Sequence, residues 1–419
     1  MGTDRAWDNP ETMLGVDDAL ARILAHLTPL PEVDLSLLAA QGLVAARDVT
    51  SRVDIPPYRN SAMDGYAVRS ADTADAPVML RVVGTVAAGS VSDRSISPGE
   101  AIRIMTGAPV PDGADAVVRF EETDERSRPA NTDRDQITIE RPIRVSENVR
   151  EAGEDIRSGQ TVVQAGQVVD PAIIGVLAAI GHATVAVHRR PRVAVLSTGD
   201  ELLDAGSSLA PGQIRDSNGP MLASLVNQAG GEAVPLGIAR DTAEGLHERL
   251  SRLDDIDLII TSGGVSVGDY DIVKVVLGSE GAIDIWQVRM KPGKPLAFGT
   301  LRDTPLLGLP GNPAAAFVSF YQFARPAIRT LLGHQRFGLP EEDATLTTSI
   351  ENRGRRRHFV RAHARRSPHG VEVRPAGGHG SGQLTPITRA NCFIVVPEAR
   401  ESIDAGEVVR IQWFGEPSG

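Results

Sequence analysis

The chain has 419 residues, more than one hydrophobic core usually organises, so several domains are expected. Its formal net charge of −11 argues against general nucleic-acid binding, because an acidic surface repels phosphate backbones. The sequence contains no apolar run of the roughly 18 residues that a membrane span needs, no stretch typical of a secretory signal, and a single cysteine, Cys392. We therefore expect a cytoplasmic protein with no membrane span, no nucleic-acid partner and no intrachain disulfide.

The first half of the chain changes character along its length. Apolar residues at helical spacing, from Val16 to Leu27, predict a helical segment over about residues 14–50. From residue 52 to 150, β-rich runs such as VMLRVVGTV lie between turn sequences, which predicts a small β-domain. An apolar helix is then predicted over residues 172–180.

Residues 192–333 alternate between buried strands, such as RVAVLST and DLIIT, and apolar helices. This alternation predicts a doubly wound, mostly parallel sheet with helices on both faces, a fold that binds ligands beyond the carboxyl ends of its strands. The helices are predicted over residues 220–229, 243–253, 272–277 and 313–332. The expected domains are a helical and linker domain (1–51 and 158–190), a small β-domain (52–157), an α/β domain (191–334) and a C-terminal β-domain (335–419).

Two loops that follow predicted strands of the α/β domain carry candidate chemistry. In the first, Ser197–Glu201, adjacent carboxylates at a strand end could hold Mg²⁺, although Asp200 could equally cap a helix. The second, Thr261–Asp269, is rich in glycine and serine, so its backbone N–H groups could cradle a phosphate. The alternative for this loop is an ordinary glycine-rich connection, which we consider less favoured.

Lysine is unusually rare: of 43 basic residues only Lys274, Lys291 and Lys294 are lysines. Two of them lie in the turn Lys291–Pro295, where prolines fix the backbone and present compact positive charges to an anion. The alternative is a solvated surface turn. A further turn, Leu309–Pro313, precedes a predicted helix, and a simple helix start explains its sequence.

Taken together, these segments resemble the MoeA family of molybdopterin molybdenumtransferases, which includes the E domain of gephyrin. The resemblance covers nearly the whole chain. It implies an α/β multidomain fold: a MogA-like parallel-sheet core, N-terminal helical and β-domains, and a small C-terminal β-domain. It also implies a homodimer that inserts molybdate into adenylylated molybdopterin and releases AMP, assisted by Mg²⁺. The motifs, in family order, are NSAMDGYAV, RIMTGAPVPDGADAVV, VREAGEDI, LSTGDEL, PGQIRDSN, TSGGVSVGDYD, MKPGKPLAFG and LPGNPAAAFVSFYQF.

The resemblance places the site in a cleft between the α/β domain of one subunit and the small β-domain of the other. Matching positions imply that Glu201, Asp241 and Asp271 hold the metal, and that these three act in catalysis with Asp64 and Thr106. The implied substrate-binding residues are Arg150, Asp155, Ser262, Gly263, Gly264, Ser266, Lys291, Lys294, Pro310, Pro313 and Ser381.

This chain departs from the family pattern at a few positions. Gln287 stands where many relatives have lysine, and Arg289 could compensate for it; Arg59 replaces an acidic residue. The arginine-rich run GRRRHFVRAHARR is interpreted as a solvated strand face.

Two other functions remain open at this stage. A MogA-type adenylyltransferase would use the same core on ATP and molybdopterin, but it would need only that core. A gephyrin-like scaffold would instead bind the tail of a partner protein, and a MogA-type enzyme is a further conceivable partner. Molybdate and tungstate are similar tetrahedral oxyanions, so the sequence favours neither.

Overall fold

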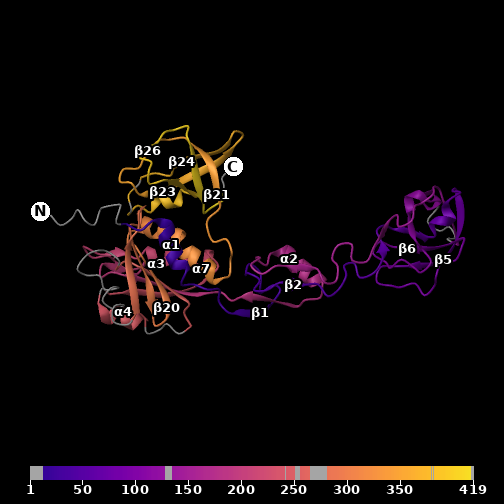
Figure 1. Ribbon diagram of the computed structural model, residues 1–419, viewed down its shortest axis with the longest axis horizontal. Helices are drawn as coiled ribbons and strands as arrows, with labels where there is room; N and C mark the ends of the chain where they lie inside the picture. Colours follow the sequence, from indigo (N-terminus) through magenta and orange to yellow (C-terminus); the bar gives the residue numbers. More distant parts are fainter. Residues whose placement is uncertain are drawn as a thin grey trace.

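The computed structural model describes residues 13–127, 135–240, 242–250, 255–264, 281–378, 380 and 382–416. The chain is elongated: the α/β domain and the C-terminal β-domain lie at one end, and the small β-domain lies at the other (Figure 1). A thin neck joins the two ends. Among the described residues, no helix is both long and apolar enough to cross a membrane.

The α/β domain is built on a sheet with the strand order β15-β12-β16-β20-β19-β17. The first four strands run parallel, whereas β19 and β17 are antiparallel to their neighbours. The doubly wound, mostly parallel sheet expected from the sequence is therefore confirmed. The strands are β12 (Arg192–Thr198), β15 (Glu232–Ala239), β16 (Leu258–Ser262), β17 (Gly281–Gln287), β19 (Pro295–Leu301) and β20 (Thr304–Leu309).

Helices cover both faces of this sheet because its strands are apolar on both sides. Val193 and Val195 belong to the core cluster that includes residues of α3 and of the long helix, whereas Ala194 and Leu196 belong to a second cluster with Leu250 of α4. The helices are α3 (Asn218–Gln228), α4 (Ala243–Leu250) and a continuous run of α6 (Pro313–Ser319), the π-turn η5 (Phe320–Ala324) and α7 (Arg325–Leu331). The helix predicted over 272–277 lies outside the described residues.

The π-turn interrupts the helix that the sequence predicts as regular over 313–332. Pro326 has no N–H group, so the bond to the carbonyl four residues earlier cannot form. The π-turn ends at Ala324, two residues before this proline, and the helix resumes as α7.

The prediction of a helical segment over residues 14–50 is wrong beyond its first part. Helix α1 covers Val16–Leu24, and the chain then forms strand β1, Glu32–Ser36. Pro29 and Pro31 lie between them and prevent continuation of the helix. Helix α1 does not pack in the neck: its buried residues join the main core cluster, and it contacts α7 and η5.

The neck consists of two short antiparallel ribbons and one helix. Strand β1 pairs with β11 (Thr184–His188), and β2 (Val49–Thr50) pairs with β10 (Thr161–Val163). Helix α2, Pro171–Ala179, begins where the Asp170 side chain accepts a hydrogen bond from the Ile173 N–H at 2.8 Å. The helix predicted over 172–180 is confirmed.

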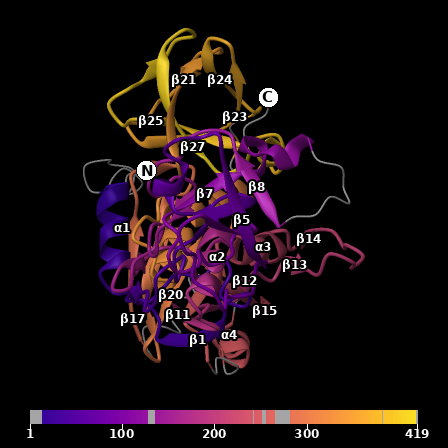
Figure 2. The same ribbon diagram turned by 90° about the vertical axis from the view of Figure 1, so that its right-hand side faces the viewer.

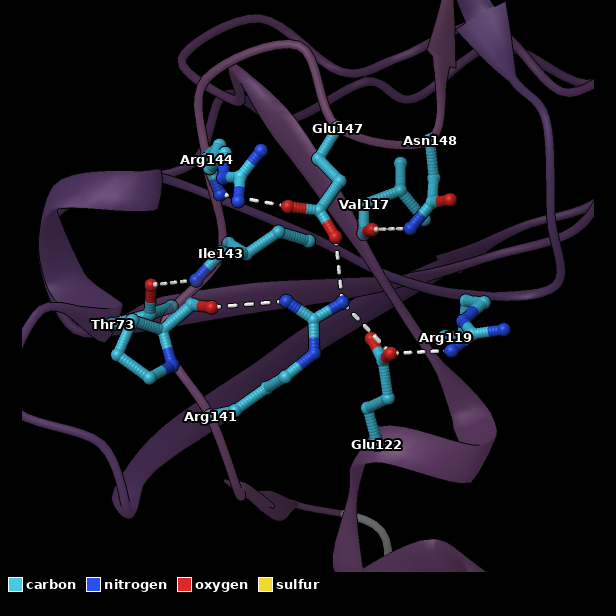
Figure 3. A network of polar contacts seen from close by, with 10 residues as sticks. Thr73, Val117, Arg119, Glu122, Arg141, Ile143, Arg144, Glu147 and Asn148 are labelled. Atoms are coloured by element: carbon cyan, nitrogen blue, oxygen red, sulfur yellow. Dashed lines mark hydrogen bonds and ion pairs between the residues drawn. The ribbon is translucent and has the colours of Figure 1, made fainter.

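The small β-domain has a sheet in the order β7-β4-β6-β5-β8 and carries ion pairs at its surface. Figure 3 shows Arg141 between Glu122 and Glu147, with Nη2 to carboxylate distances of 2.7 and 2.6 Å. The hydrogen bond from Arg141 lowers the pKa of Glu147. The elements are β3 (Asn60–Ser61), β4 (Gly65–Val68), β5 (Val78–Val86), β6 (Glu100–Ile104), β7 (Ala116–Arg119), β8 (Gln136–Ile139), β9 (Val149–Arg150) and the 3₁₀ turns η2 (Ser70–Thr73), η3 (Phe120–Glu122) and η4 (Asp124–Ser127).

The C-terminal domain is a closed barrel that stands above the α/β sheet in both views (Figures 1 and 2). Its strands follow the order β23-β24-β21-β27-β25, and β25 pairs back onto β23. Strand β18 of the α/β domain adds to this barrel beside β23. The elements are β18 (Met290–Lys291), β21 (Glu341–Leu346), β22 (Ile350–Glu351), β23 (Arg357–Ser367), β24 (Gly370–Pro375), α8 (Thr385–Thr388), β25 (Cys392–Val396), β26 (Ser402–Ile403) and β27 (Val408–Trp413).

The interpretation of GRRRHFVRAHARR as a solvated strand face is only partly right. In β23, His358 to Ala362 are buried, and only the end of the strand, with Arg365 and Arg366, is exposed. Closure of the barrel buries the first half of the strand on both sides. Arg361 is 5% exposed and donates hydrogen bonds to the carbonyls of Gly378 and Gly380.

Candidate active site

A cavity of about 420 Å³ lies at the carboxyl ends of the parallel strands. Three loops that the sequence places after separate strands meet there, because parallel strands end at the same edge of a sheet. We call it the substrate cavity. Its lining residues are Ser197, Thr198, Gly199, Glu201, Leu202, Ile214, Arg215, Asp216, Ser217, Asn218, Ser262, Gly263, Gly264, Gly311, Asn312 and Pro313.

Gly263 allows β12 and the turn after β16 to approach closely. Its φ is +95°, and a Cβ atom there would lie 2.7 Å from the Thr198 carbonyl oxygen. The Gly263 N–H donates to the Leu309 carbonyl at 3.0 Å, so it is engaged within the sheet. The sequence predicts a phosphate cradle at Gly263 and Gly264. Both glycines line the cavity, and the residues that follow Gly264 in this loop lie outside the described residues.

Asn218, at the start of α3, joins two of the loops and was missed by sequence reasoning. Its Nδ2 donates to Ser262 Oγ at 2.8 Å and to the Gly311 carbonyl at 2.6 Å. Within the described part of the chain, Asn218 Oδ1, Ser197 Oγ and Thr198 Oγ1 are buried without a hydrogen-bond partner. These unpaired polar atoms at one end of the cavity are typical of a site that a polar ligand completes.

The amino end of α3 opens into this cavity. The Asp216 carboxylate accepts hydrogen bonds from the N–H groups of Asn218 and Gly219, at 3.0 and 2.9 Å. Strand β14 (Ile214–Arg215) directly precedes Asp216, and its pairing with β13 (Leu202–Leu203) fixes the start of this turn. The Asp216 carboxylate thus already caps the amino end of this 11-residue helix and offsets its partial positive charge.

Glu201 is the described member of the predicted metal-ligand set. It lines the cavity, and an oxygen ligand of this kind suits Mg²⁺. Asp241 and Asp271 lie outside the described residues, as do Ser266 and Ser381. Among the residues that are described, no group of three or more His, Cys, Asp or Glu side chains is placed to hold a metal ion. The described residues therefore supply one possible ligand of a magnesium site, Glu201, and not a complete ligand set.

The alternative in which Asp200 caps a helix is wrong. Residues 199–201 form a turn that leads into β13 rather than into a helix. Gly199 has a φ of +152°, and a Cβ atom there would lie 2.6 Å from a carboxylate oxygen of Glu201. The glycine thus leaves room for the Glu201 side chain beside the strand end.

Of the two predicted rim prolines, Pro313 lines the cavity, whereas Pro310 is not part of its lining. The Pro310 carbonyl is 3.5 Å from Ser262 Oγ, and Pro313 lines the cavity as the first residue of α6. Asn312 precedes it at the N-cap position but makes no side-chain cap hydrogen bond.

The predicted lysine turn lies at the same edge of the sheet but outside the cavity lining. Gln287 pairs with Pro295 across β17 and β19, and Lys291 pairs with His358 of the barrel strand β23. Burial, with a smaller contribution from the Arg356 charge, lowers the pKa of Lys291. Arg361 of β23 holds the carbonyls on either side of residue 379, next to the predicted Ser381. Lys291 and Arg361 therefore lie on two paired strands, β18 and β23.

Asp64 and Thr106 contact each other at the far end of the molecule. One carboxylate oxygen of Asp64 accepts hydrogen bonds from the Thr106 N–H at 2.7 Å and from its hydroxyl at 2.8 Å. These two bonds lower the pKa of Asp64, so the carboxylate is ionised at neutral pH. Both residues are exposed. Thr106 follows β6, and Figure 1 shows β6 at the opposite end of the molecule from α3, whose first residue lines the substrate cavity.

Arg150 and Asp155 lie near the junction of the small β-domain and the neck. Arg150 pairs with Asn60 across β3 and β9, and the Asp155 N–H donates to the Ile55 carbonyl at 3.1 Å. Both side chains are exposed, and among described residues they form no ion pair with each other. Arg59 pairs instead with Glu151, at 3.2 Å.

Family models match three successive parts of the chain. They are the MoeA N-terminal region (domain I and II) over residues 14–181, a probable molybdopterin binding domain over 194–330, and the MoeA C-terminal region (domain IV) over 343–414.

Individual relatives match over nearly the full length. A molybdopterin molybdenumtransferase of Haemophilus influenzae is 37% identical, covering 97% of this chain and 100% of its own. The molybdopterin molybdenumtransferase 2 of Mycobacterium tuberculosis is 39% identical, covering 90% and 94%. Two crystal structures of molybdopterin biosynthesis MoeA protein from Pyrococcus horikoshii match with TM-scores of 0.82 and 0.80, at 32% and 27% identity, each covering 96% of this chain and 100% of its own.

Proposed function

The chain belongs to the MoeA family, and from this premise we propose that it is a cytoplasmic molybdopterin molybdenumtransferase that inserts molybdate into adenylylated molybdopterin. The reaction would release AMP and form the molybdenum cofactor. The observation that carries the proposal is the substrate cavity, where Glu201, the glycine turn after β16 and the amino end of α3 converge. That combination suits an anionic phosphate ester at a strand edge.

Residues of the cavity would divide the work of binding. The turn at Gly264 would hold the phosphate of the adenylylated pterin, and Asn218 would fix the two loops around it. As AMP leaves, negative charge develops on its phosphate.

Molybdate would bind beside the lysine turn. Lys291 and Lys294 bring positive charge to the sheet edge, and β18 fixes Lys291 against the barrel. Ser381 would complete the oxyanion site from the loop that Arg361 supports. Point charges at a partly buried position favour a small oxyanion over bulk water.

A homodimer would complete the site. Within one chain Asp64 and Thr106 lie at the opposite end from the substrate cavity, and an exposed, ionised carboxylate fixed by two hydrogen bonds is suited to a partner. We propose that this pair reaches the substrate cavity of the second subunit.

Mg²⁺ is proposed as an assisting ion held by Glu201, Asp241 and Asp271. When bound, it would neutralise charge on the phosphoanhydride. Titration calorimetry with MgCl₂ should show Glu201→Gln binding the ion at least about tenfold more weakly. Asp204→Asn, in the turn after β13, is the control and should bind as the parent does. Equal affinity in the parent and Glu201→Gln would remove Glu201 from the metal site.

The decisive assay supplies adenylylated molybdopterin with molybdate to one sample and ATP with molybdopterin to another. We expect cofactor formation and AMP release only in the first sample, and a loss of roughly 100-fold or more in Asp64→Asn and Glu201→Gln. Turnover in the second sample would instead identify a MogA-type adenylyltransferase. If neither sample shows turnover but the chain still binds a protein partner, a scaffold of the gephyrin type would be favoured.

A further inference from the structure

A second cavity lies at the other end of α3, between the α/β domain and the C-terminal barrel. We call it the junction pocket; its volume is about 200 Å³. Helix α3 contributes Leu225, Gln228 and Ala229 to it, whereas Asn218 lines the substrate cavity, and the two cavities share no lining residue. Eleven helical residues at 1.5 Å each separate the two ends of α3 by about 16 Å.

The walls of the junction pocket are aromatic and fixed. The ring centroids of Tyr321 and Phe414 are 5.2 Å apart. The Tyr321 hydroxyl donates to Gln228 Oε1 at 3.1 Å, and burial raises the pKa of Tyr321 to about 12, so this phenol is neutral. Trp413 also lines the pocket, but its Nε1–H is already engaged with Glu342 at 3.0 Å. The Tyr321 hydroxyl and the Trp413 N–H are therefore both already engaged, and the neutral phenol adds no charge to the pocket.

The only charged side chain among the described residues that line this pocket is Arg325. Its Nη1 donates to the Phe337 carbonyl at 2.7 Å, which is the one hydrogen bond of this guanidinium within the described chain. Burial first, and the neighbouring Arg329 charge second, lower the pKa of Arg325 to about 10, so it remains positive at neutral pH.

Nearby acidic residues do not neutralise this guanidinium. Glu341 accepts a hydrogen bond from Gln412 at 3.0 Å, and Glu342 is held by Trp413 and by Arg366. Arg329 and His334 contact each other at 3.1 Å, and burial lowers the pKa of His334 to about 4, so this histidine is neutral. A half-buried cation without a carboxylate partner is electrostatically incomplete.

We propose that the junction pocket binds a small planar organic anion, a carboxylate on a single aromatic ring. The carboxylate would accept hydrogen bonds from the unpaired guanidinium nitrogens of Arg325 and from the Gln228 amide nitrogen, whose oxygen partner is taken by Tyr321. The ring would lie against Tyr321 and Phe414. The cavity has the volume of about seven water molecules, which is enough for one substituted ring.

Ligand-observed NMR titration of the full chain with benzoate tests this proposal without any turnover. Benzamide keeps the ring without the charge, and acetate keeps the charge without the ring. We expect both to bind at least about tenfold more weakly than benzoate. Acetate binding as tightly as benzoate would overturn the aromatic part of the proposal, and no saturable benzoate binding up to about 10 mM would overturn all of it.

Three variants locate the site. Arg325→Gln should weaken benzoate binding at least about tenfold, and Ala229→Phe, which fills the cavity but keeps the guanidinium, should abolish saturation. Arg336→Gln changes an exposed arginine between α7 and β21, outside the pocket lining, and should bind as the parent does. Circular dichroism confirms that each variant is folded. If Arg325→Gln fails to fold, benzoate binding by Ala229→Phe is the deciding measurement. Unchanged benzoate binding by Ala229→Phe would contradict the proposal.

Discussion

Single residues around the substrate cavity act through backbone geometry as much as through charge. Gly263 and Gly42 share a positive φ, +95° and +79°, but only Gly263 is crowded by another strand end. This contrast separates the cost of the left-handed conformation from the cost of lost space.

Gly263→Ala should therefore destabilise the protein more than Gly42→Ala. The added methyl group at Gly42 meets nothing within 4 Å, so only the backbone strain of about 1 kcal/mol applies. At Gly263 the methyl group also collides with Thr198, which should bring the total to about 2–4 kcal/mol. Urea unfolding of the two variants measures the difference. Equal losses would show that Thr198 moves aside freely.

Thr106 should control the protonation of Asp64. The pKa of Asp64 lies below its ordinary value because of the backbone and hydroxyl bonds from Thr106. Thr106→Val keeps the first bond and loses the second, so the pKa should rise while staying below that of an ordinary aspartate. A lowered carboxylate pKa stabilises the fold above the unfolded pKa, and this contribution is lost as pH falls through the folded pKa. Carbon-13 NMR titration measures the shift, and Thr106→Ser should show none.

The sequence indicates the cavity loops but not the residue that joins them. Glu201, Ser262 and Pro313 follow or begin predicted elements, so the strand-edge rule finds them. Asn218 resembles an ordinary helix-start residue, and its partners Ser262 and Gly311 lie 44 and 93 positions away. Local patterns carry no information about such contacts. Asp64 and Thr106 were reached through the family resemblance alone.

At the scale of elements, the burial of a strand's side chains depends on whether its sheet closes into a barrel, and the sequence pattern of one strand does not reveal this. β23 has arginines at both ends of its run, which resembles a solvated face, yet the barrel buries Arg361 and exposes Arg365. At residues 14–50 the sequence predicts too long a helix. Helix α1 ends at Leu24, because prolines follow.

Arg361→Lys and Arg365→Lys form a matched pair on this strand. A lysine at 361 cannot donate along the same directions to the carbonyls of Gly378 and Gly380, so we expect a loss of about 2–3 kcal/mol. Arg365 pairs with Glu372 at the surface, where the substitution should change stability by no more than about 0.5 kcal/mol. Guanidinium unfolding compares them, and similar losses would contradict the buried role of Arg361.

At the scale of the whole molecule, the alternation of strands and helices predicts the parallel sheet, but it does not predict the neck. The ribbons β1–β11 and β2–β10 join segments more than 100 positions apart, and their short strands give little periodic signal. The separation between the small β-domain and the α/β domain is therefore apparent only from the structure (Figure 1).

Subunit mixing tests the proposed dimeric site. In a heterodimer of Asp64→Asn and Glu201→Gln chains, one site would contain both native residues if the site spans two subunits. Random reassociation makes half of the dimers mixed, so about a quarter of the parental activity should return. Each variant alone should remain inactive, and a mixture that stays inactive would place both residues within one chain or outside the mechanism.

The scarcity of lysine has a chemical consequence. Acylating reagents that modify side-chain amines have only Lys274, Lys291 and Lys294 to react with, and two of these flank the turn where the sheet edge meets the barrel. Because burial lowers the pKa of Lys291, more of its amine is in the nucleophilic, uncharged form at neutral pH. Mild labelling would therefore attach a fluorophore or an affinity tag beside the proposed oxyanion site without engineering the protein.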